Sequence, residues 1–154
     1  SNAMYLAEAL AQRVEAQRRY SELNQLLLDV AKVQEGDQPA ENPHEILTEL
    51  EELTTRINDL VRRINRTNSV TEFSEGMTLA DALSVRDALL KKRTLYSDLA
   101  DQLTSRQDRY SRSEIKYVAT MDAREIRKKA DLAAKEYRQL DVDIQRLNWQ
   151  TELQ

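Results

Sequence analysis

Residues 42–76 read NPHEILTELEELTTRINDLVRRINRTNSVTEFSEG, and they carry most of the information on the fold. The first part holds a seam of large apolar residues, spaced alternately four and three apart: Ile46, Leu50, Leu53, Ile57, Leu60 and Ile64. A 3.5-residue repeat keeps one side of a helix against a neighbour, as in coiled coils and long bundles. Asn42 can cap such a helix and Pro43 suits its first turn, so we predict a long helix that begins there.

The same stretch changes character after its last isoleucine. The repeat stops at Thr67, where leucine is expected, and arginines and asparagines replace the apolar residues. Residues 68–73 alternate weakly and are β-prone, which predicts a short strand. Residues 74–76 (Ser-Glu-Gly) predict a turn.

Outward from this stretch, apolar stripes predict three further helices, over about residues 4–33, 79–103 and 123–149. Gly36 and Pro39 end the first of them, and Thr78 and Asp122 cap the other two. The last helix repeats the four-three spacing in Ile126, Ala130, Ala133, Tyr137, Leu140, Ile144 and Leu147. A second β-prone run, residues 115–120, is expected to pair with residues 68–73.

These elements predict a mainly α fold. We expect an elongated four-helix bundle, or paired long helical hairpins, with a small two-stranded β-ribbon at one end. Residues 1–3 look like the remnant of an expression tag, and residues 4–154 are expected to form a single helical domain. Few aromatic residues (5%) and many charged ones (32%) predict a thin core, which an oligomer would complete.

Composition argues against several classes of function. The net charge of −4 favours neither nucleic acid nor an anionic membrane as a partner. The absence of cysteine excludes disulfides and thiolate chemistry. Neither a signal peptide nor an apolar run of about 20 residues is evident, so we expect a cytoplasmic protein.

Five motifs together resemble a known family. They are VQEGD (33–37) followed by Pro39, RINRTN (63–68), TLADAL (78–83), RYSRSEIK (109–116) and LNW (147–149). In this order they are similar to the septicolysin-like family of small, largely uncharacterised bacterial proteins, over essentially the whole chain. The family name implies a membrane-active cytolysin, and the resemblance brings no catalytic residues with it.

Catalytic and metal chemistry has little support in the sequence. His44 is the only histidine, and Glu41-x-x-His44 has the spacing of one carboxylate-bridged metal half-site. A second such motif is absent, and Pro43 interrupts the segment. Gly36 and Gly76 stand alone, so no glycine-rich phosphate loop can form. We therefore expect no enzyme activity, no metal and no cofactor.

The arginine-rich joint is the main candidate site. Its residues are Arg63, Asn65, Arg66, Asn68, Arg109, Arg112 and Lys116. Guanidinium groups match phosphate oxygens, so this cluster could bind a phosphate, a nucleotide or a nucleic-acid backbone. The alternative is a structural polar cap, in which interleaved carboxylates neutralise the arginines. Tyr110 and Tyr117 add only a weak indication of base stacking.

Three apolar residues of the last helix lie off its seam, namely Leu132, Val142 and Trp149. A helix with a second apolar line touches a second neighbour, either in the same chain or in another subunit. Our leading hypothesis is a non-enzymatic interaction or scaffold protein that forms a homo-oligomer. The alternatives are an anion-binding module at the arginine-rich joint and a membrane-active protein of the septicolysin type.

Overall fold

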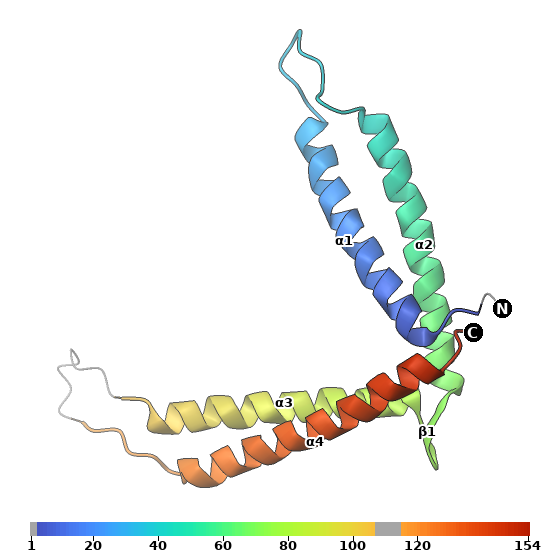
Figure 1. Cartoon of the computed structure of the whole chain (residues 1–154). Helices are drawn as coiled ribbons and strands as arrows, with labels where there is room; N and C mark the ends of the chain where they lie inside the picture. Colours follow the sequence, from blue (N-terminus) through green and yellow to red (C-terminus); the bar gives the residue numbers. More distant parts are fainter. Residues whose placement is uncertain (1–2, 107–114) are drawn as a thin grey trace. The chain divides into compact units, whose positions relative to one another are not determined.

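The computed structural model of the chain describes residues 3–106 and 115–154 (Figure 1). These residues form four helices and one two-stranded antiparallel sheet, which confirms a mainly α fold of paired hairpins with a small β-ribbon. The chain divides into two compact units. The first joins the residues up to Thr78 with Gln145–Gln154, and the second is Leu79–Ile144.

The first unit contains a hairpin of two helices, α1 (Leu6–Val30) and α2 (Pro43–Val70), which lie side by side in Figure 1. The start predicted for the second of these helices is confirmed. The side-chain oxygen of Asn42 accepts a hydrogen bond from the backbone N–H of His44 at 2.9 Å. This bond satisfies one of the N–H groups that a helix start leaves without an intrahelical partner.

The size of the buried side chains of α1 differs along this hairpin. Near the loop, Leu23 of α1 packs with Ile46 and Leu50 of α2. Farther from the loop, the buried residues of α1 include Ala9 and Ala16. Small side chains let two helix backbones approach more closely than leucines do.

The end of α2 differs from the prediction. The helix continues to Val70, so the start predicted for the strand at Asn68 is wrong, whereas Glu72 and Phe73 do lie in a strand. Thr67 is completely buried and therefore continues the apolar seam with a polar residue. The Thr67 hydroxyl donates to the Arg63 carbonyl oxygen at 2.7 Å, and the Thr71 hydroxyl donates to the Thr67 carbonyl oxygen at 2.6 Å. In both bonds a threonine hydroxyl donates to the backbone carbonyl four residues earlier, which gives the hydroxyl a local partner.

The β-ribbon forms from neighbouring segments. Strands β1 (Glu72–Ser74) and β2 (Met77–Thr78) pair antiparallel around a turn that contains Gly76 at φ +78°. The predicted pairing of residues 68–73 with residues 115–120 is wrong, because the latter form no strand and their side chains are exposed. A tight turn has a much smaller entropy cost of closure than a pairing across about 40 residues.

The two ends of the described chain meet in the first unit. Tyr5 and Glu152 form an isolated antiparallel bridge, and the Leu6 N–H donates to the Thr151 carbonyl oxygen at 2.8 Å. No side chain caps α1, so the Thr151 carbonyl takes that role. Helix α1 therefore begins at Leu6 rather than at Met4, because the residues before it are extended in the bridge.

The second hairpin pairs α3 (Leu79–Thr104) with α4 (Ala123–Gln150), whose last turns belong to the first unit. The predicted cap of the last helix is confirmed, since the Asp122 carboxylate accepts from the Arg124 N–H at 2.9 Å. Seven buried apolar residues hold this unit together: Leu79, Ala82, Ala100, Ile126, Ala130, Ala133 and Ile144. None of the helices in the described residues is long and apolar enough to cross a membrane.

Two ion pairs join the helices of the second hairpin. Arg86 lies 2.8 Å from Asp141, and both side chains are about one quarter to one third exposed. Arg127 lies 3.4 Å from Asp101, and both side chains are mostly exposed. Together the two pairs define the antiparallel register of α3 against α4.

Candidate functional site

The arginine-rich end of α2 is built around a buried hydroxyl. Besides donating to the helix, the Thr67 hydroxyl accepts a hydrogen bond from the Gln154 N–H at 2.9 Å. The Arg63 guanidinium donates to the Gln154 carbonyl oxygen at 3.3 Å and lies 3.9 Å from the Asp59 carboxylate. Arg63 therefore binds the peptide backbone of the C-terminal segment.

The neighbouring candidates have different surroundings. Asn65 and Arg66 are exposed, and Asn68 is half-buried. The Asn65 carbonyl oxygen accepts a hydrogen bond from the Ser69 hydroxyl at 2.9 Å, as part of the regular helix. The Arg66 side chain forms no ion pair with another described residue.

The remaining candidates lie outside the first unit or outside the described residues. Arg109 and Arg112 lie outside the described residues. Lys116 is exposed in an irregular segment of the second unit, whereas Arg63 and Arg66 belong to the first unit. The described residues thus assemble the α2 part of the predicted site.

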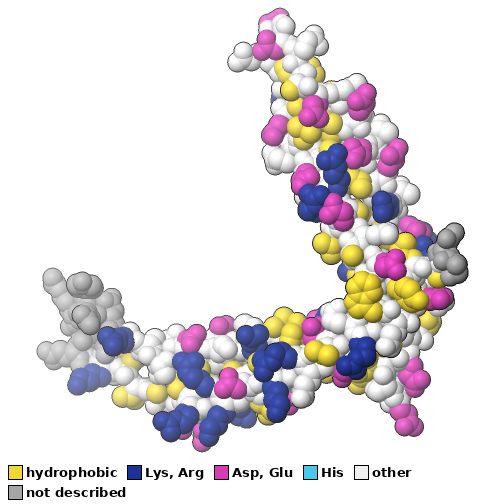
Figure 2. Space-filling view, in the orientation of Figure 1, with side chains coloured by type: hydrophobic (Ala, Val, Ile, Leu, Met, Phe, Trp, Pro, Cys, Tyr) yellow, Lys and Arg dark blue, Asp and Glu magenta, His cyan; other side chains and the backbone are white. Residues whose placement is uncertain are grey.

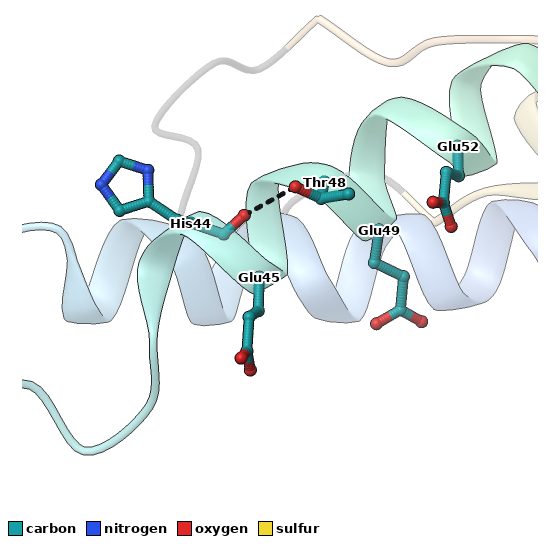
Figure 3. Close-up of a pocket in the computed structure, with 5 residues that line it drawn as sticks. All are labelled: His44, Glu45, Thr48, Glu49 and Glu52. Carbon is teal, nitrogen blue, oxygen red and sulfur yellow. Dashed lines mark hydrogen bonds between the residues drawn. The ribbon is translucent and has the colours of Figure 1, made fainter.

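A shallow hollow lies at the start of α2, on the first hairpin. Figure 3 shows its lining residues His44, Glu45, Thr48, Glu49 and Glu52. The Thr48 hydroxyl donates to the His44 carbonyl oxygen at 3.0 Å, and the imidazole ring points away from the carboxylates of Glu45 and Glu49 (Figure 3). The side chains do not converge on one point, and the described residues contain no group of three or more metal-ligating side chains.

An ion pair crosses the first hairpin beside this hollow. The Arg19 guanidinium lies 3.1 Å from the Glu49 carboxylate, and both side chains are nearly half exposed. The same groups line a second hollow between α1 and α2, together with Leu23, Leu26 and Ile46. Both hollows are acidic surface depressions rather than enclosed cavities.

The off-seam residues of α4 are exposed. Leu132 is 57% exposed, Val142 56% and Trp149 63%. Leu132 and Val142 belong to the second unit, and Trp149 belongs to the first. Within each unit, the described residues leave more than half of each of these side chains exposed.

Sequence reasoning missed the contact between the chain ends and α2. Residues 151–154 carry no strong pattern, and neither do residues 4–6. The available signal was Thr67 itself, a polar residue at a position where the repeat predicts leucine. A polar residue in a buried seam indicates a hydrogen-bond partner from elsewhere in the chain.

Comparison with known proteins places the chain in a family. A family model described as a family of unknown function, DUF6847, matches residues 13–153. The match includes most of α1 and all of the following helices and strands. No match is found among curated proteins. The chain therefore belongs to the DUF6847 family of unknown function.

Proposed function

We propose that this protein is a non-enzymatic interaction or scaffold protein that self-associates through the exposed apolar residues of α4. The observation that supports this proposal is the exposure of Leu132 and Val142, each more than half exposed on the second hairpin. Trp149 makes a separate apolar contribution from the first unit.

The energetic argument follows from the thinness of a two-helix hairpin. Each helix covers one side of its neighbour, and the opposite sides stay in water. Burial of an exposed leucine or valine side chain contributes about 1.5–3 kcal/mol, and tryptophan has a larger apolar area. Covering these side chains with a second copy would supply the burial that the thin core lacks.

Sedimentation velocity across a wide range of protein concentration tests this proposal. We expect a concentration-dependent assembly, weakened by Leu132→Ser or Val142→Ser. Val14→Ser is a matched control, because Val14 of α1 is also exposed (62%) and loses the same apolar groups. A strict monomer at every concentration contradicts the proposal, as does an equal effect of the Val142 and Val14 substitutions.

A second candidate function is anion binding at the end of α2. Its support is Arg66, which is exposed and has no ion-pair partner among the described residues. A guanidinium in this setting can bind a phosphate group in bidentate geometry. Thermal-shift titrations with phosphate, nucleotides and single-stranded DNA test this candidate. We expect a stabilising shift that Arg66→Gln abolishes, and no shift with any of the three would dismiss it.

The resemblance to septicolysin-like proteins suggests membrane activity as a further alternative. Leakage of a dye from liposomes containing anionic lipid tests it directly. Dye release at micromolar protein would favour this alternative over a scaffold, and intact liposomes would dismiss it.

A further inference from the structure

Charge is divided unequally between the two hairpins. Residues 28–52, which form the loop end of the first hairpin, contain eight acidic residues and one basic residue, a net charge of −7. In the second hairpin, residues 91–106 and 124–138 contain ten basic and five acidic residues, a net charge of +5. Figure 2 shows many Lys and Arg side chains on this second hairpin. We name these two regions the acidic end and the basic face.

Both regions also expose apolar side chains. On the acidic end, Leu28 is 64% exposed and Leu47 is 44% exposed. On the basic face, Leu95 of α3 is 61% exposed and Leu132 of α4 is 57% exposed. The register set by the Arg86–Asp141 pair places Leu95 and Leu132 at the same level of the hairpin, because each lies nine residues from its ion-paired residue. Nine residues are about two and a half helical turns, so each leucine lies on the side of its helix opposite the ion pair.

The lysines of the basic face are available for a partner. Five of them flank the two exposed leucines: Lys91, Lys92, Lys128, Lys129 and Lys135. None of the five forms an ion pair with another described residue. Lysine stems can cover apolar surface while the ammonium groups meet carboxylates, so this face suits an acidic, partly apolar partner.

We propose that the basic face of one copy binds the acidic end of a second copy. Charge complementarity identifies the occupant, since the chain itself carries a partner surface of opposite sign with matching exposed leucines. The interface joins two different surfaces. It gives a two-fold dimer where the same two copies make both contacts reciprocally, and rings or filaments where each copy binds a different neighbour. This inference rests on the proposed self-association and specifies the surface that meets Leu132.

Charge reversal on each surface provides the test. One variant is Lys128→Glu with Lys129→Glu, and the other is Glu41→Lys with Glu45→Lys. The first variant lowers the net charge of the basic face from +5 to +1, and the second changes that of the acidic end from −7 to −3. Each variant therefore loses most of the charge complementarity of one surface, so self-association should weaken by about tenfold or more. When the two variants are mixed, each acidic surface faces a basic one again, and assembly should return. Wild-type assembly should also weaken at high ionic strength, because salt screens exposed charges.

A matched control separates this interface from a general effect of net charge. Glu72→Lys with Glu75→Lys changes the charge by the same amount as the acidic-end variant, on exposed residues of the ribbon and its turn. It should assemble like the wild type, because both its acidic end and its basic face are unchanged. Circular dichroism checks that all three variants keep their helix content.

The outcomes distinguish this inference from the broader proposal. If the wild type assembles but the mixture of variants does not, the inference is overturned and self-association through other residues stands. A wild-type monomer at every concentration overturns both. Monomeric wild type that binds single-stranded DNA through Lys128 and Lys129 overturns both and assigns the basic face to a polyanion. Charge variants that change the hydrodynamic radius without any dependence on concentration indicate a contact within one chain and likewise overturn the inference.

Discussion

Thr67 is a polar residue at a position of the apolar repeat of α2, and the helix continues beyond it. The position belongs to the α2 seam and is completely buried, yet it carries a hydroxyl. That hydroxyl both donates to the helix and accepts the Gln154 N–H, so its two roles need a threonine or a serine. Leucine at this position would extend the apolar repeat but leave the Gln154 N–H without its acceptor.

Substitution of Thr67 tests this account. Thr67→Val keeps the shape and removes the acceptor, and we expect a loss of about 1–2 kcal/mol in the free energy of unfolding. Hydrogen exchange should accelerate at the amide of Gln154. Thr67→Ser is the control, because it keeps the hydroxyl and should keep that amide protected. Equal exchange rates in both variants would contradict the assigned role.

Glu15 offers a second prediction at the residue scale. The Arg18 side chain on the next turn of α1 hydrogen-bonds the Glu15 carboxylate and holds its pKa below the ordinary value. The charged form is therefore favoured in the folded state, and the associated stability is present above the ordinary carboxyl pKa and lost as the pH falls through the lowered one. Arg18→Gln should raise the pKa of Glu15, as measured by carbon-detected NMR titration. An unchanged titration curve would contradict the assignment.

The two ion pairs of the second hairpin differ in burial, and burial decides how much each contributes to stability. Arg86 and Asp141 meet at a partly buried part of the α3–α4 contact, whereas Arg127 and Asp101 meet near solvent. Exposed ion pairs contribute little, because water and salt screen them and the side chains lose conformational freedom. Partial burial reduces that screening.

A double-mutant cycle with Arg86→Met and Asp141→Asn should give a coupling energy of about 1 kcal/mol in urea denaturation. The same cycle on Arg127 and Asp101 should give less than about 0.5 kcal/mol, and it should vanish at high salt. Similar coupling energies for the two pairs would show that exposure does not separate them.

On the scale of the whole molecule, the chain is organised as two compact units that share α4. The first unit has its own apolar cluster around Leu23, Ile46 and Leu50. A substitution that weakens this cluster should therefore destabilise the first unit before the second.

Leu50→Ala should lower the free energy of unfolding by about 2–4 kcal/mol, because it leaves a cavity in this cluster. Hydrogen–deuterium exchange should accelerate in α1 and α2 and change much less in α3. Leu47→Ala, at a position 44% exposed on the same helix, is the control and should cost less than about 1 kcal/mol. Equal acceleration in both hairpins would indicate a single cooperative unit.

The features that the amino-acid pattern predicted correctly are local. The caps at Asn42 and Asp122, the start of α3 at Leu79 and the seams of α2 and α4 depend on residues within one or two helical turns. The exposure of Leu132, Val142 and Trp149 also agrees with an off-seam position, because helical periodicity sets which side of a helix a residue takes.

The features that escaped prediction depend on segments far apart in sequence. The Thr67–Gln154 bond joins residues 87 positions apart, and the Arg86–Asp141 pair joins residues 55 positions apart. The predicted ribbon paired two distant β-prone runs, whereas the chain closed the nearer turn at Gly76 and kept residues 68–70 in α2. Propensity along the sequence cannot choose between such partners, because each choice depends on the free energy of all the contacts that the folded chain makes at once.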